Sequence, residues 1–553
     1  MQIVIPMSGF GERFRRAGFT VPKPLVEVDG KPIIAHVVDL FPGADSFVFV
    51  CNAEHLAAAD YDMKETLEAI APGARIVAIQ PHRLGPVHAV LEAADAIDPD
   101  APVIVNYCDF ACYWDFDHFR NFVARSAADG AVACYRGFHP HMLGSTNYAY
   151  VRDVDGWATD IQEKQPFTAT PMAEFASSGT YYYRSGALML DAFRRTMGQG
   201  LSVNDEYYVS LTYKPLLADG RRVAVYELQH FMQWGTPEDL AEYRSWSEAF
   251  GRLAKPAEGA GPAQAGTVLM PMAGLGSRFE AEGYDRPKPL IPVSGKPMAV
   301  QAARDLPRAE AHVFALRREL SERPAVEAAL RGAFPECRIV LLDAATDGQA
   351  RTCLLALEGV DPEAPLTIAA CDTGALYDAG GLQALLADDA ADVVVWAARR
   401  HPPAARRPEM YGWIEADAAG RVRGVSVKVP LAAPESDPIV IGTFTFKRAR
   451  DFAAAAEAMI DREARVNGEF YVDTCINDAI QMGLDVRLFE IDHYLCWGTP
   501  EELRSFEYWQ SCFHKWPSHP YSLAADGDVP ADAVAALEKR YQPCRPPLPG
   551  SAP

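Results

Sequence analysis

Two short stretches of the chain carry glycines, an arginine and a lysine in the same order. Residues 7–34 read MSGFGERFRRAGFTVPKPLVEVDGKPII, and residues 272–299 read MAGLGSRFEAEGYDRPKPLIPVSGKPMA. Glycine adopts positive φ readily and leaves no side chain in the way, so the backbone N–H groups of such a loop can close on phosphate oxygens. An arginine two residues further on is placed to donate a bidentate pair to a phosphate. We therefore predict two phosphate-binding loops, formed by Gly9, Gly11 and Arg13 and by Gly274, Gly276 and Arg278.

Each loop is followed by a lysine that stands between two prolines. Lys23 and Lys288 both lie in the sequence Pro-Lys-Pro-Leu. Because proline restricts the backbone, it fixes the direction of this lysine, which suits a cation that must sit on a transferring phosphoryl group. Two better-known phosphate motifs do not fit. Phe14 and Phe279 occupy the third glycine position of the dinucleotide fingerprint, and the GKP at 30–32 lacks the upstream glycine and the Ser or Thr of a P-loop.

The matching positions recur along almost the whole chain. Pairs 263 to 265 residues apart include Gly9 and Gly274, Lys23 and Lys288, Asp109 and Asp372, Lys164 and Lys428, Glu206 and Glu469, and Trp234 and Trp497. Arrays of small repeats have periods of about 20 to 50 residues, so this period indicates two complete globular domains. We predict domains at 1–250 and 267–515, an exposed Gly/Ala/Pro-rich linker at 251–266, and an extension at 516–553 with a helix near 530–541 and a poorly ordered Pro-rich end.

Alternating segments predict the fold class of each domain. Short β-branched runs occur at 3–6, 47–51, 75–79 and 102–106, and stretches of helical length and spacing lie between them. The second half repeats these runs at 267–271, 312–316, 338–342 and 366–370. Strands that alternate with helices predict an α/β fold, in which a mostly parallel, mixed sheet is flanked by helices.

Composition limits the partners of the protein. Hydrophobic residues make up 49% and charged residues 23% of the 553 residues, as in ordinary globular proteins. A formal net charge of −22 argues against salt-driven binding to nucleic acid. No stretch reaches the roughly 18 apolar residues of a membrane span, and the N-terminus lacks the basic region of a signal peptide. The eleven cysteines form no CxxC pair, which favours reduced thiols in a cytoplasm.

Three motifs follow one another in each half: GxGxR, PKPL and V-x-GKP. This order resembles the signature of the sugar-1-phosphate nucleotidyltransferases, also called NDP-sugar pyrophosphorylases. The resemblance covers about residues 1–245 and 266–510. It implies a Rossmann-like domain in each half. It also implies that an NTP and a sugar 1-phosphate are converted to an NDP-sugar and pyrophosphate with Mg²⁺.

The resemblance assigns the metal and nucleotide residues by position. Asp109 and Asp372, at the ends of strand-like segments, stand where the family's metal-binding aspartate follows its strand, and a carboxylate there suits Mg²⁺. The segment 79–90 resembles the one that holds the nucleobase. Candidate contacts in the two halves are Gln80 and Gly85, and Gly348 and Gln349. Because the two segments differ, base preference is expected to differ between the halves.

The sugar-phosphate residues follow from the same resemblance. Glu163 and Lys164 match the family's Glu-Lys pair, in which the glutamate meets sugar hydroxyls and the lysine meets the sugar phosphate. The second half has Val427 and Lys428 here, so the sugar-binding carboxylate is expected to be missing from that half. Further residues expected to line this part of the site are Gly179, Glu206, Gly442 and Glu469.

One departure concerns the metal. Members of the thymidylyltransferase type carry a second metal-binding aspartate before a Gly-Thr dipeptide, whereas Gln233 and Cys496 stand at that position here. Neither is a strong Mg²⁺ ligand. Either the metal relies on Asp109 or Asp372 with phosphate oxygens and water, or another carboxylate enters.

The expected partners are therefore an NTP and a sugar 1-phosphate, and the sequence determines neither the sugar, the base nor the oligomeric state; a homo-oligomer is compatible with it. Three alternatives stay open. The enzyme could join CTP to phosphocholine or another phospho-alcohol. It could be a glycosyltransferase, although the DFD at 115–117 follows its strand too late for a DxD metal motif and is absent from the second half. One half could be a non-catalytic regulatory module.

Overall fold

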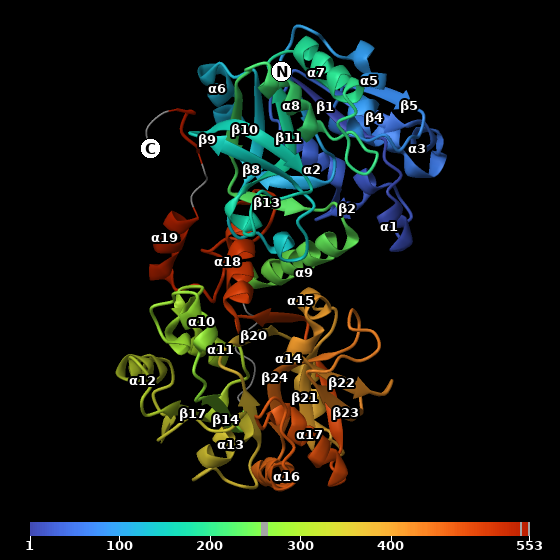
Figure 1. Cartoon of the computed structure of the whole chain (residues 1–553). Helices are drawn as coiled ribbons and strands as arrows, with labels where there is room; N and C mark the ends of the chain where they lie inside the picture. The colour runs from blue at the N-terminus through green and yellow to red at the C-terminus, as the bar shows by residue number, and fades with distance from the viewer. Residues whose placement is uncertain (256–263, 542–544, 551–553) are drawn as a thin grey trace. The chain divides into compact units, whose positions relative to one another are not determined.

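The structure is a computed structural model that describes residues 1–255, 264–541 and 545–550. It divides into two compact units. The first unit comprises Met1–Ser247, Lys515–His519 and the described part of Tyr541–Pro553, and the second comprises Glu248–His514, in its described part, and Pro520–Arg540. Each unit contains one large sheet with helices on both faces (Figure 1).

The large sheet of the first unit has nine strands. In spatial order they are β5 (Arg75–Ile79), β4 (Ser46–Asn52), β1 (Gln2–Met7), β6 (Val103–Asn106), β11 (Phe175–Tyr183), β8 (Gly130–Tyr135), β12 (Val223–Glu227), β10 (Trp157–Glu163) and β9 (Ala149–Val154). The first four run parallel, and β11 is antiparallel to both of its neighbours β6 and β8. All six residues of β1 are buried, as expected of a central strand that is covered on both faces.

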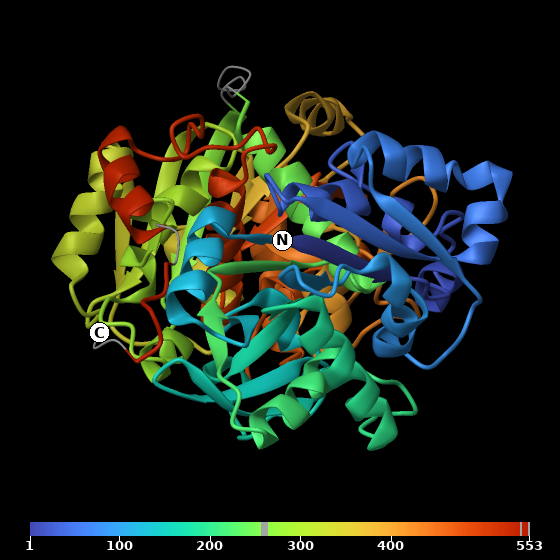
Figure 2. The same cartoon turned by 90° about the horizontal axis from the view of Figure 1, so that it is seen from above.

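Helices cover both faces of this sheet (Figure 2). The helices from the N-terminus to the end of α9 are α1 (Glu12–Arg16), α2 (Ile33–Asp39), α3 (Ala53–Ala57), α4 (Met63–Ile70), α5 (Pro86–Glu92), α6 (Phe116–Ser126), α7 (Gly186–Gly198), α8 (Tyr213–Ala218) and α9 (Pro237–Leu253), of which α9 ends in the second unit. Helices α5 and α7 contribute to one core cluster with Val4 and Val105. On the other face, the ring of Phe119 in α6 packs edge-on against Tyr182 and Tyr226.

The second unit repeats this strand order. Its large sheet runs β18 (Arg338–Leu342), β17 (Ala309–Arg317), β14 (Gln264–Met272), β19 (Leu366–Ala369), β24 (Ile439–Phe446), β21 (Val393–Ala398) and β25 (Val486–Glu490), and β24 also pairs with β22 (Gly412–Ala416), which pairs with β23 (Val422–Val427). The predicted α/β class and the tandem duplication are therefore confirmed. The predicted strands lie where expected, because β-branched runs flanked by turn residues suit a buried sheet.

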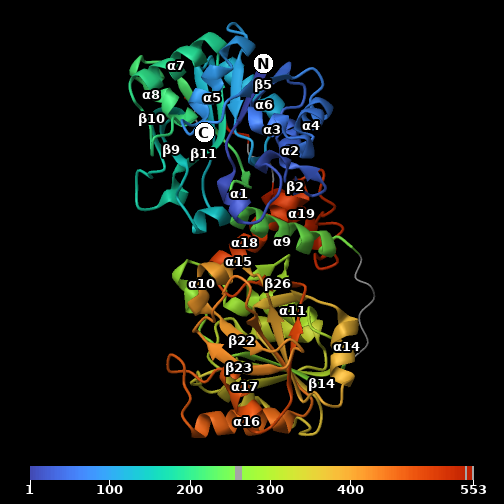
Figure 3. The ribbon, with the colours of Figure 1, turned by 90° about the vertical axis from the view of Figure 1, so that its right-hand side faces the viewer.

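The helices of the second unit include two that cover the same face of its sheet. Its helices are α10 (Ser277–Ala281), α11 (Met298–Arg304), α12 (Arg323–Ala333), α13 (Gln349–Ala356), α14 (Ala379–Ala387), α15 (Pro402–Arg406), α16 (Ala449–Asp461), α17 (Val472–Gln481), α18 (Pro500–Lys515) and α19 (Ala531–Arg540). Figure 3 shows α16 and α17 side by side, and both supply residues to one core cluster.

A small antiparallel pair of strands completes each unit. In the first unit β7 (Phe110–Tyr113) pairs with β13 (His230–Gln233), and in the second β20 (Thr373–Leu376) pairs with β26 (His493–Cys496). The backbone N–H of Trp234 donates to Asp109 O at 3.0 Å. The small sheet therefore holds the loop that follows β6 against the start of α9.

The predicted boundary regions differ in part from what the structure describes. Residues 251–253 of the predicted linker end α9, and 264–266 begin β14, while 256–263 lie outside the described residues. The helix expected near 530–541 is α19. The expectation of a poorly ordered Pro-rich end falls partly on 551–553, which also lie outside the described residues.

Gly85 and Gly348 lie close to the backbone of Tyr207 and of Phe470, respectively. This close packing predicts that a side chain at Gly85 destabilises the fold more than one at an open glycine. A Cβ on Gly85 would lie 2.8 Å from the backbone N and O of Tyr207, and Gly85 has φ +87°. Gly43 also has positive φ (+72°) but no atom within 4 Å of its Cβ position. We expect Gly85→Ala to lower the free energy of unfolding by about 2 kcal/mol more than Gly43→Ala, because the alanine must displace backbone as well as adopt a strained φ.

Urea denaturation of the full chain measures this difference, and hydrogen exchange localises it to residues near 85 and 207. Equal destabilisation by the two substitutions would show that the backbone yields without cost at Gly85.

Candidate active site

A lysine and an aspartate from distant parts of the chain meet at the carboxyl-end edge of the first sheet. Lys23 begins a 3₁₀ turn, Lys23–Leu25, and its Nζ donates to Asp109 Oδ2 at 2.7 Å. Each side chain is 23% exposed. Burial by itself would lower the pKa of Lys23, but the charge and the hydrogen bond of Asp109, together with Cys108, outweigh burial and raise that pKa. The structure therefore keeps a protonated amine that remains accessible to a ligand.

The second unit contains the same pair. Lys288 donates to Asp372 Oδ2 and, at 3.1 Å, to the carbonyl oxygen of Gly498. Burial opposes and Asp372 raises the pKa of Lys288, which again ends above its ordinary value. The pair is thus present in both copies although its members are more than 80 residues apart in the sequence.

The glycine loops lie between β1 and α1 and between β14 and α10. Gly11 and Gly276 precede these helices with φ of +62° and +69°, a conformation that favours glycine. A Cβ on Gly11 would lie 3.9 Å from Lys23 Cβ, so the loop runs beside the lysine. Gly9 and Gly274 have no atom within 4 Å of their Cβ positions, which leaves that side of each loop uncovered.

The two arginines that follow the loops lie near the other predicted residues. The charge of Arg13 acts on both Lys23 and Tyr208. In the second unit the charge of Arg278 acts on Lys428 and on Tyr471. Arg13 therefore lies near both the Lys23–Asp109 pair and the predicted sugar-phosphate residues of its unit. Arg278 lies near the predicted sugar-phosphate residues of the second unit.

The predicted sugar-phosphate residues of the first unit form one connected group. Lys164 has φ +58°, an uncommon value for a residue other than glycine, and its Nζ donates to Tyr208 OH at 2.5 Å. Tyr208 OH in turn donates to Glu206 Oε2. Glu163 accepts a hydrogen bond of 2.5 Å from Ser210 Oγ. The structure thus brings Glu163, Lys164 and Glu206 together.

Glu163 titrates near neutral pH. Burial raises its pKa to about 7, the Ser210 hydrogen bond and Lys164 oppose this rise, and Glu206 adds to it. A carboxyl group in such surroundings can exchange its proton in the physiological range.

The second unit keeps the lysine but arranges its surroundings differently. Lys428 has φ +64° and donates to the carbonyl oxygen of Met410. Burial lowers its pKa, and the charges of Asp473 and Glu469 oppose this effect. Val427 lies beside it, as the sequence requires. Lys428 and Glu469 are therefore near one another, as predicted.

The candidate metal ligands lie beyond their strands. Asp109 and Asp372 were expected to end strands, but β6 ends at Asn106 and β19 ends at Ala369. The ladder stops there because the chain turns away toward the small sheet, where Gln233 pairs with Phe110 and Cys496 with Thr373. Both aspartates therefore occupy connecting loops at the carboxyl ends of the sheets.

A further carboxylate stands near the candidate metal position. A Cβ on Gly498 would lie 3.3 Å from Asp372 Oδ2, 3.4 Å from Glu502 Oε2 and 3.6 Å from Cys496 Sγ. Burial, with Glu502 and Asp372, raises the pKa of the Cys496 thiol, so this sulfur is neutral and unsuited to Mg²⁺. Within the described residues no cluster of three or more His, Cys, Asp or Glu side chains could hold a metal ion. Mg²⁺ in proteins is nevertheless often coordinated by only one or two carboxylates together with substrate phosphates and water.

Glu502 and its counterpart Asp239 also cap helices. Thr236 Oγ1 donates to Asp239 Oδ2 at 2.8 Å and Thr499 Oγ1 donates to Glu502 Oε2 at 2.9 Å, at the starts of α9 and α18. The backbone N–H groups of Asp239 and Glu502 donate back to the same threonine oxygens, and this reciprocal arrangement accounts for a Thr followed three residues later by an acidic residue in both halves. Tyr411 OH also donates to Glu502, at 3.2 Å.

The predicted nucleobase residues are only partly brought to the site. Gly85 and Gly348 precede α5 and α13 and are tied to the 203–207 and 466–470 segments, where Tyr207 N donates to Leu84 O at 2.9 Å and Phe470 N to Asp347 O at 2.8 Å. Gln80 and Gln349 are exposed and contact none of the other predicted residues through a hydrogen bond in the described structure. Their predicted role stays a prediction.

The two glycines of the central antiparallel strands support the walls of the sites. Gly179 in β11 has φ +96°, and a Cβ there would lie 2.9 Å from the ring of Tyr107. Gly442 in β24 has φ +80°, and its Cβ position lies 3.1 Å from Ala370 Cβ. Sequence reasoning missed Tyr107, Tyr208 and Ser210. For Tyr208 the duplication held a signal, because Tyr471 stands 263 residues further on.

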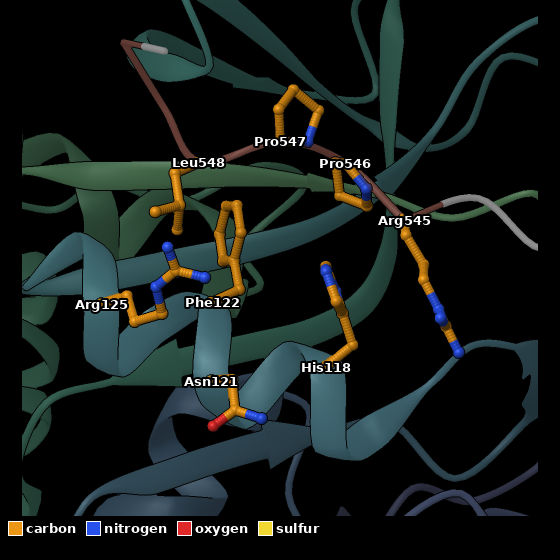
Figure 4. Close-up of a pocket in the computed structure, with 8 residues that line it drawn as sticks. All are labelled: His118, Asn121, Phe122, Arg125, Arg545, Pro546, Pro547 and Leu548. Atoms are coloured by element: carbon orange, nitrogen blue, oxygen red, sulfur yellow. The ribbon is translucent and has the colours of Figure 1, made fainter.

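Two other features lie apart from this site. The DFD at 115–117 caps a helix, since Asp115 accepts a hydrogen bond of 2.9 Å from the N–H of His118 at the start of α6. A cavity of about 360 Å³ lies between α6 and residues 545–548 (Figure 4). None of the predicted site residues lines it; its lining is His118, Asn121, Phe122, Arg125, Arg545, Pro546, Pro547 and Leu548.

No helix in the described ranges combines the length and the apolar character that crossing a membrane requires. The ten cysteines in the described ranges are free thiols, and nine of them are buried.

Comparison with known proteins connects this geometry to a family. The chain is 30% identical over 220 residues to the bifunctional protein GlmU of Burkholderia thailandensis, a match that covers 38% of this chain and 43% of that protein. It is 25% identical over 293 residues to the mannose-1-phosphate guanylyltransferase catalytic subunit beta of Danio rerio, with 50% of this chain and 73% of that protein covered. The chain thus spans less than half the length of the GlmU relative.

A solved structure described as the nucleoside-diphosphate-sugar pyrophosphorylase of Vibrio cholerae RC9 shares 22% identity; the match covers 43% of this chain and 98% of that one, with a TM-score of 0.36. The family model described as the MobA-like NTP transferase domain matches residues 3–170 and again 268–430, which together exceed half of the chain. The protein therefore belongs to the family of MobA-like NTP transferase domains and contains that domain twice.

Proposed function

We propose that the protein transfers a nucleotidyl group from an NTP to a sugar 1-phosphate and releases pyrophosphate. The observation that carries this proposal is the Lys23–Asp109 pair beside the glycine loop, which recurs as Lys288–Asp372 in the second unit. An accessible protonated lysine next to a glycine loop that is open on the side of Gly9 suits a polyphosphate. The mannose-1-phosphate guanylyltransferase among the relatives supports the same class of reaction.

In the proposed reaction, an oxygen of the sugar phosphate attacks the α-phosphorus of the NTP in line. The bond from that phosphorus to the bridging oxygen of the β-phosphate breaks, and pyrophosphate leaves toward the glycine loop and Arg13. The phosphate monoester is already nucleophilic at neutral pH, so no general base is needed and catalysis consists mainly of positioning and charge neutralisation. Lys23 would neutralise the α-phosphate, and Lys164 would hold the attacking phosphate.

Asp109 and Asp372 would hold Mg²⁺, with Glu502 as a further carboxylate near Asp372. When bound, this ion would neutralise charge on the phosphate oxygens. Gln233 and Cys496 would not act as ligands.

Two other functions would use the same residues. The first is transfer of a cytidylyl group to phosphocholine or another phospho-alcohol, which needs the same phosphate contacts. The second is a non-catalytic second unit that binds a nucleotide sugar and regulates the first, which is compatible with Val427 in place of a carboxylate. A matrix of NTPs against sugar 1-phosphates and phospho-alcohols, read by pyrophosphate release, separates these functions. We expect release with sugar 1-phosphates and none with phospho-alcohols.

Removing either member of the first pair should abolish turnover at the first site. In a Lys288→Ala background, we expect Lys23→Ala or Asp109→Ala to lower the rate of pyrophosphate release at least about a hundredfold, because each change removes charge compensation at the α-phosphate. Lys64→Ala, which removes an exposed lysine of α4, is the matched control and should leave the rate unchanged. Near-normal release by both site variants, with circular dichroism showing a folded chain, would refute these roles.

The raised pKa of Glu163 predicts a pH dependence of stability. Since the pKa is about 7 in the folded unit against 4.5 ordinarily, folding disfavours the ionised carboxylate. Its contribution is therefore fully present below pH 4.5 and is lost as the pH rises through 7. Relative to Glu163→Gln, the unfolding free energy of the wild type should fall by about 3 kcal/mol between pH 4.5 and 8. Denaturation curves at several pH values test this, and parallel pH profiles for the two proteins would contradict it.

A further inference from the structure

Three residues in contact mark the sugar-phosphate side of the first unit. The pairing of β9 with β10 places Ala149 opposite Glu163. Ser210, at the start of the segment that follows Glu206 and Tyr208, donates to Glu163 Oε2 at 2.5 Å. The trio of Ala149, Glu163 and Ser210 therefore carries one carboxylate, and this carboxylate comes from the strand β10.

The equivalent trio of the second unit has a different composition. The pairing of β22 with β23 places Gly412 opposite Val427, just as Ala149 lies opposite Glu163. Asp473 stands 263 residues after Ser210, and it lies four residues beyond Glu469 as Ser210 lies four beyond Glu206. This trio also carries one carboxylate, but here it comes from the helix α17.

The contact between Gly412 and Asp473 shows that these differences are linked. A Cβ on Gly412 would lie only 2.4 Å from Asp473 Oδ2, so an alanine there, as at position 149, would collide with the carboxylate. Gly412 is not among the residues with positive φ, so what the glycine provides here is space beside the carboxylate and not backbone freedom. The glycine makes room for a carboxylate that the first unit does not have at this position.

Asp473 lies next to the predicted phosphate-binding lysine. It is the largest opposing charge to the effect of burial on the pKa of Lys428. Burial raises the pKa of Asp473 to about 6, with Lys428 acting against this rise, so the carboxylate is ionised at neutral pH. A simpler role for an aspartate in the first turn of a helix is to stabilise that helix. That role alone does not require a glycine on a neighbouring strand.

A second difference changes the same part of the site. In the first unit the ring of Tyr107 lies against Gly179, and burial together with the nearby Tyr181 and Glu163 raises the pKa of its hydroxyl, so Tyr107 is a neutral ring beside Glu163. The second unit has Ala370 at the position of Tyr107, against Gly442. Loss of the ring and relocation of the carboxylate therefore occur together, and both alter what the site presents to a sugar.

We propose that Asp473 replaces Glu163 as the carboxylate that accepts hydrogen bonds from the sugar hydroxyls in the second unit, so that this unit retains a sugar-phosphate site and selects a sugar 1-phosphate of different hydroxyl pattern. This inference rests on the proposed function. It differs from the expectation that the second half has lost its sugar-binding carboxylate, since it assigns that role to a residue other than the one at position 427.

The test uses the full chain with the first site disabled by Lys23→Ala. The acceptors are hexose 1-phosphates that differ in configuration at C2, C3 and C4, each with the four common NTPs and Mg²⁺. We expect Asp473→Asn to raise the KM for the preferred hexose 1-phosphate at least about tenfold while the KM for the NTP changes less than about twofold. Asp532→Asn, a first-turn aspartate of the exposed helix α19, is the matched control and should change neither constant.

An exchange of the whole trio tests the relocation itself. Asp473→Ser alone should weaken the hexose 1-phosphate as Asp473→Asn does. Gly412→Ala, Val427→Glu and Asp473→Ser together should restore the use of a hexose 1-phosphate by the second site. The triple variant should also shift the acceptor preference of the second site toward the preference of the first site, which is measured separately in a Lys288→Ala chain. A role limited to stabilising α17 would not be rescued by a carboxylate on the strand.

Binding measurements keep this inference separate from the proposed function. If the wild type releases no pyrophosphate with any substrate pair, the proposed function fails. Calorimetry of a Lys23→Ala, Lys164→Ala chain, in which the first sugar-phosphate site is also disabled, then tests the second site with the same hexose 1-phosphates, and loss of binding on adding Asp473→Asn supports the inference. An unchanged KM or dissociation constant in Asp473→Asn, or no binding of any hexose 1-phosphate to the Lys23→Ala, Lys164→Ala chain, overturns the inference.

Discussion

The site in each unit depends on one charge pair, a lysine ammonium held against an aspartate carboxylate at the carboxyl ends of the central strands. A lysine that is only about a fifth exposed would lose its proton more easily if it stood alone, since burial disfavours the charged form. The aspartate prevents this and keeps the amine charged. Because the carboxylate also satisfies the amine in the absence of ligand, the site holds a cation ready without an unpaired buried charge.

Other features of each unit serve to place this pair. The glycine loop passes beside Lys23 at the end of β1, and the small sheet of β7 and β13 fixes the loop that carries Asp109. The Thr-capped helix α9 begins directly after that sheet. The second unit repeats all of these relations with different side chains around them. The phosphate side of the site is therefore conserved between the copies, whereas the sugar side has diverged, as the exchange of Glu163 and Ser210 for Val427 and Asp473 shows.

Much of the fold could be predicted from the sequence. Strands β5 and β18 have the predicted bounds, 75–79 and 338–342, because compact β-branched runs between turn residues have no competing helical pattern. Asp109 and Asp372 were wrongly predicted to end strands, since the chain continues from the apolar runs into connecting loops and only the pairing of β6 with β11 and of β19 with β24 sets where each ladder stops.

The site was predicted less completely, for a physical reason. Glycines, Lys23 and Lys288 follow from local sequence, but partners such as Tyr208, Ser210 and Asp473 are defined by contacts between segments more than 40 residues apart. The loss of a carboxylate at Val427 was visible in the sequence. The contact between Gly412 and Asp473, on which the proposed replacement rests, was not, because it exists only where β22 meets the start of α17.

The most direct test of the account is the number of nucleotides that the intact chain binds. Isothermal titration calorimetry with Mg²⁺ and each common nucleoside triphosphate gives this number. If each Lys–Asp pair holds a triphosphate, the titrations must reveal two sites per chain, filled by one nucleotide or by two different ones. Absence of binding by every triphosphate would contradict the account at its foundation.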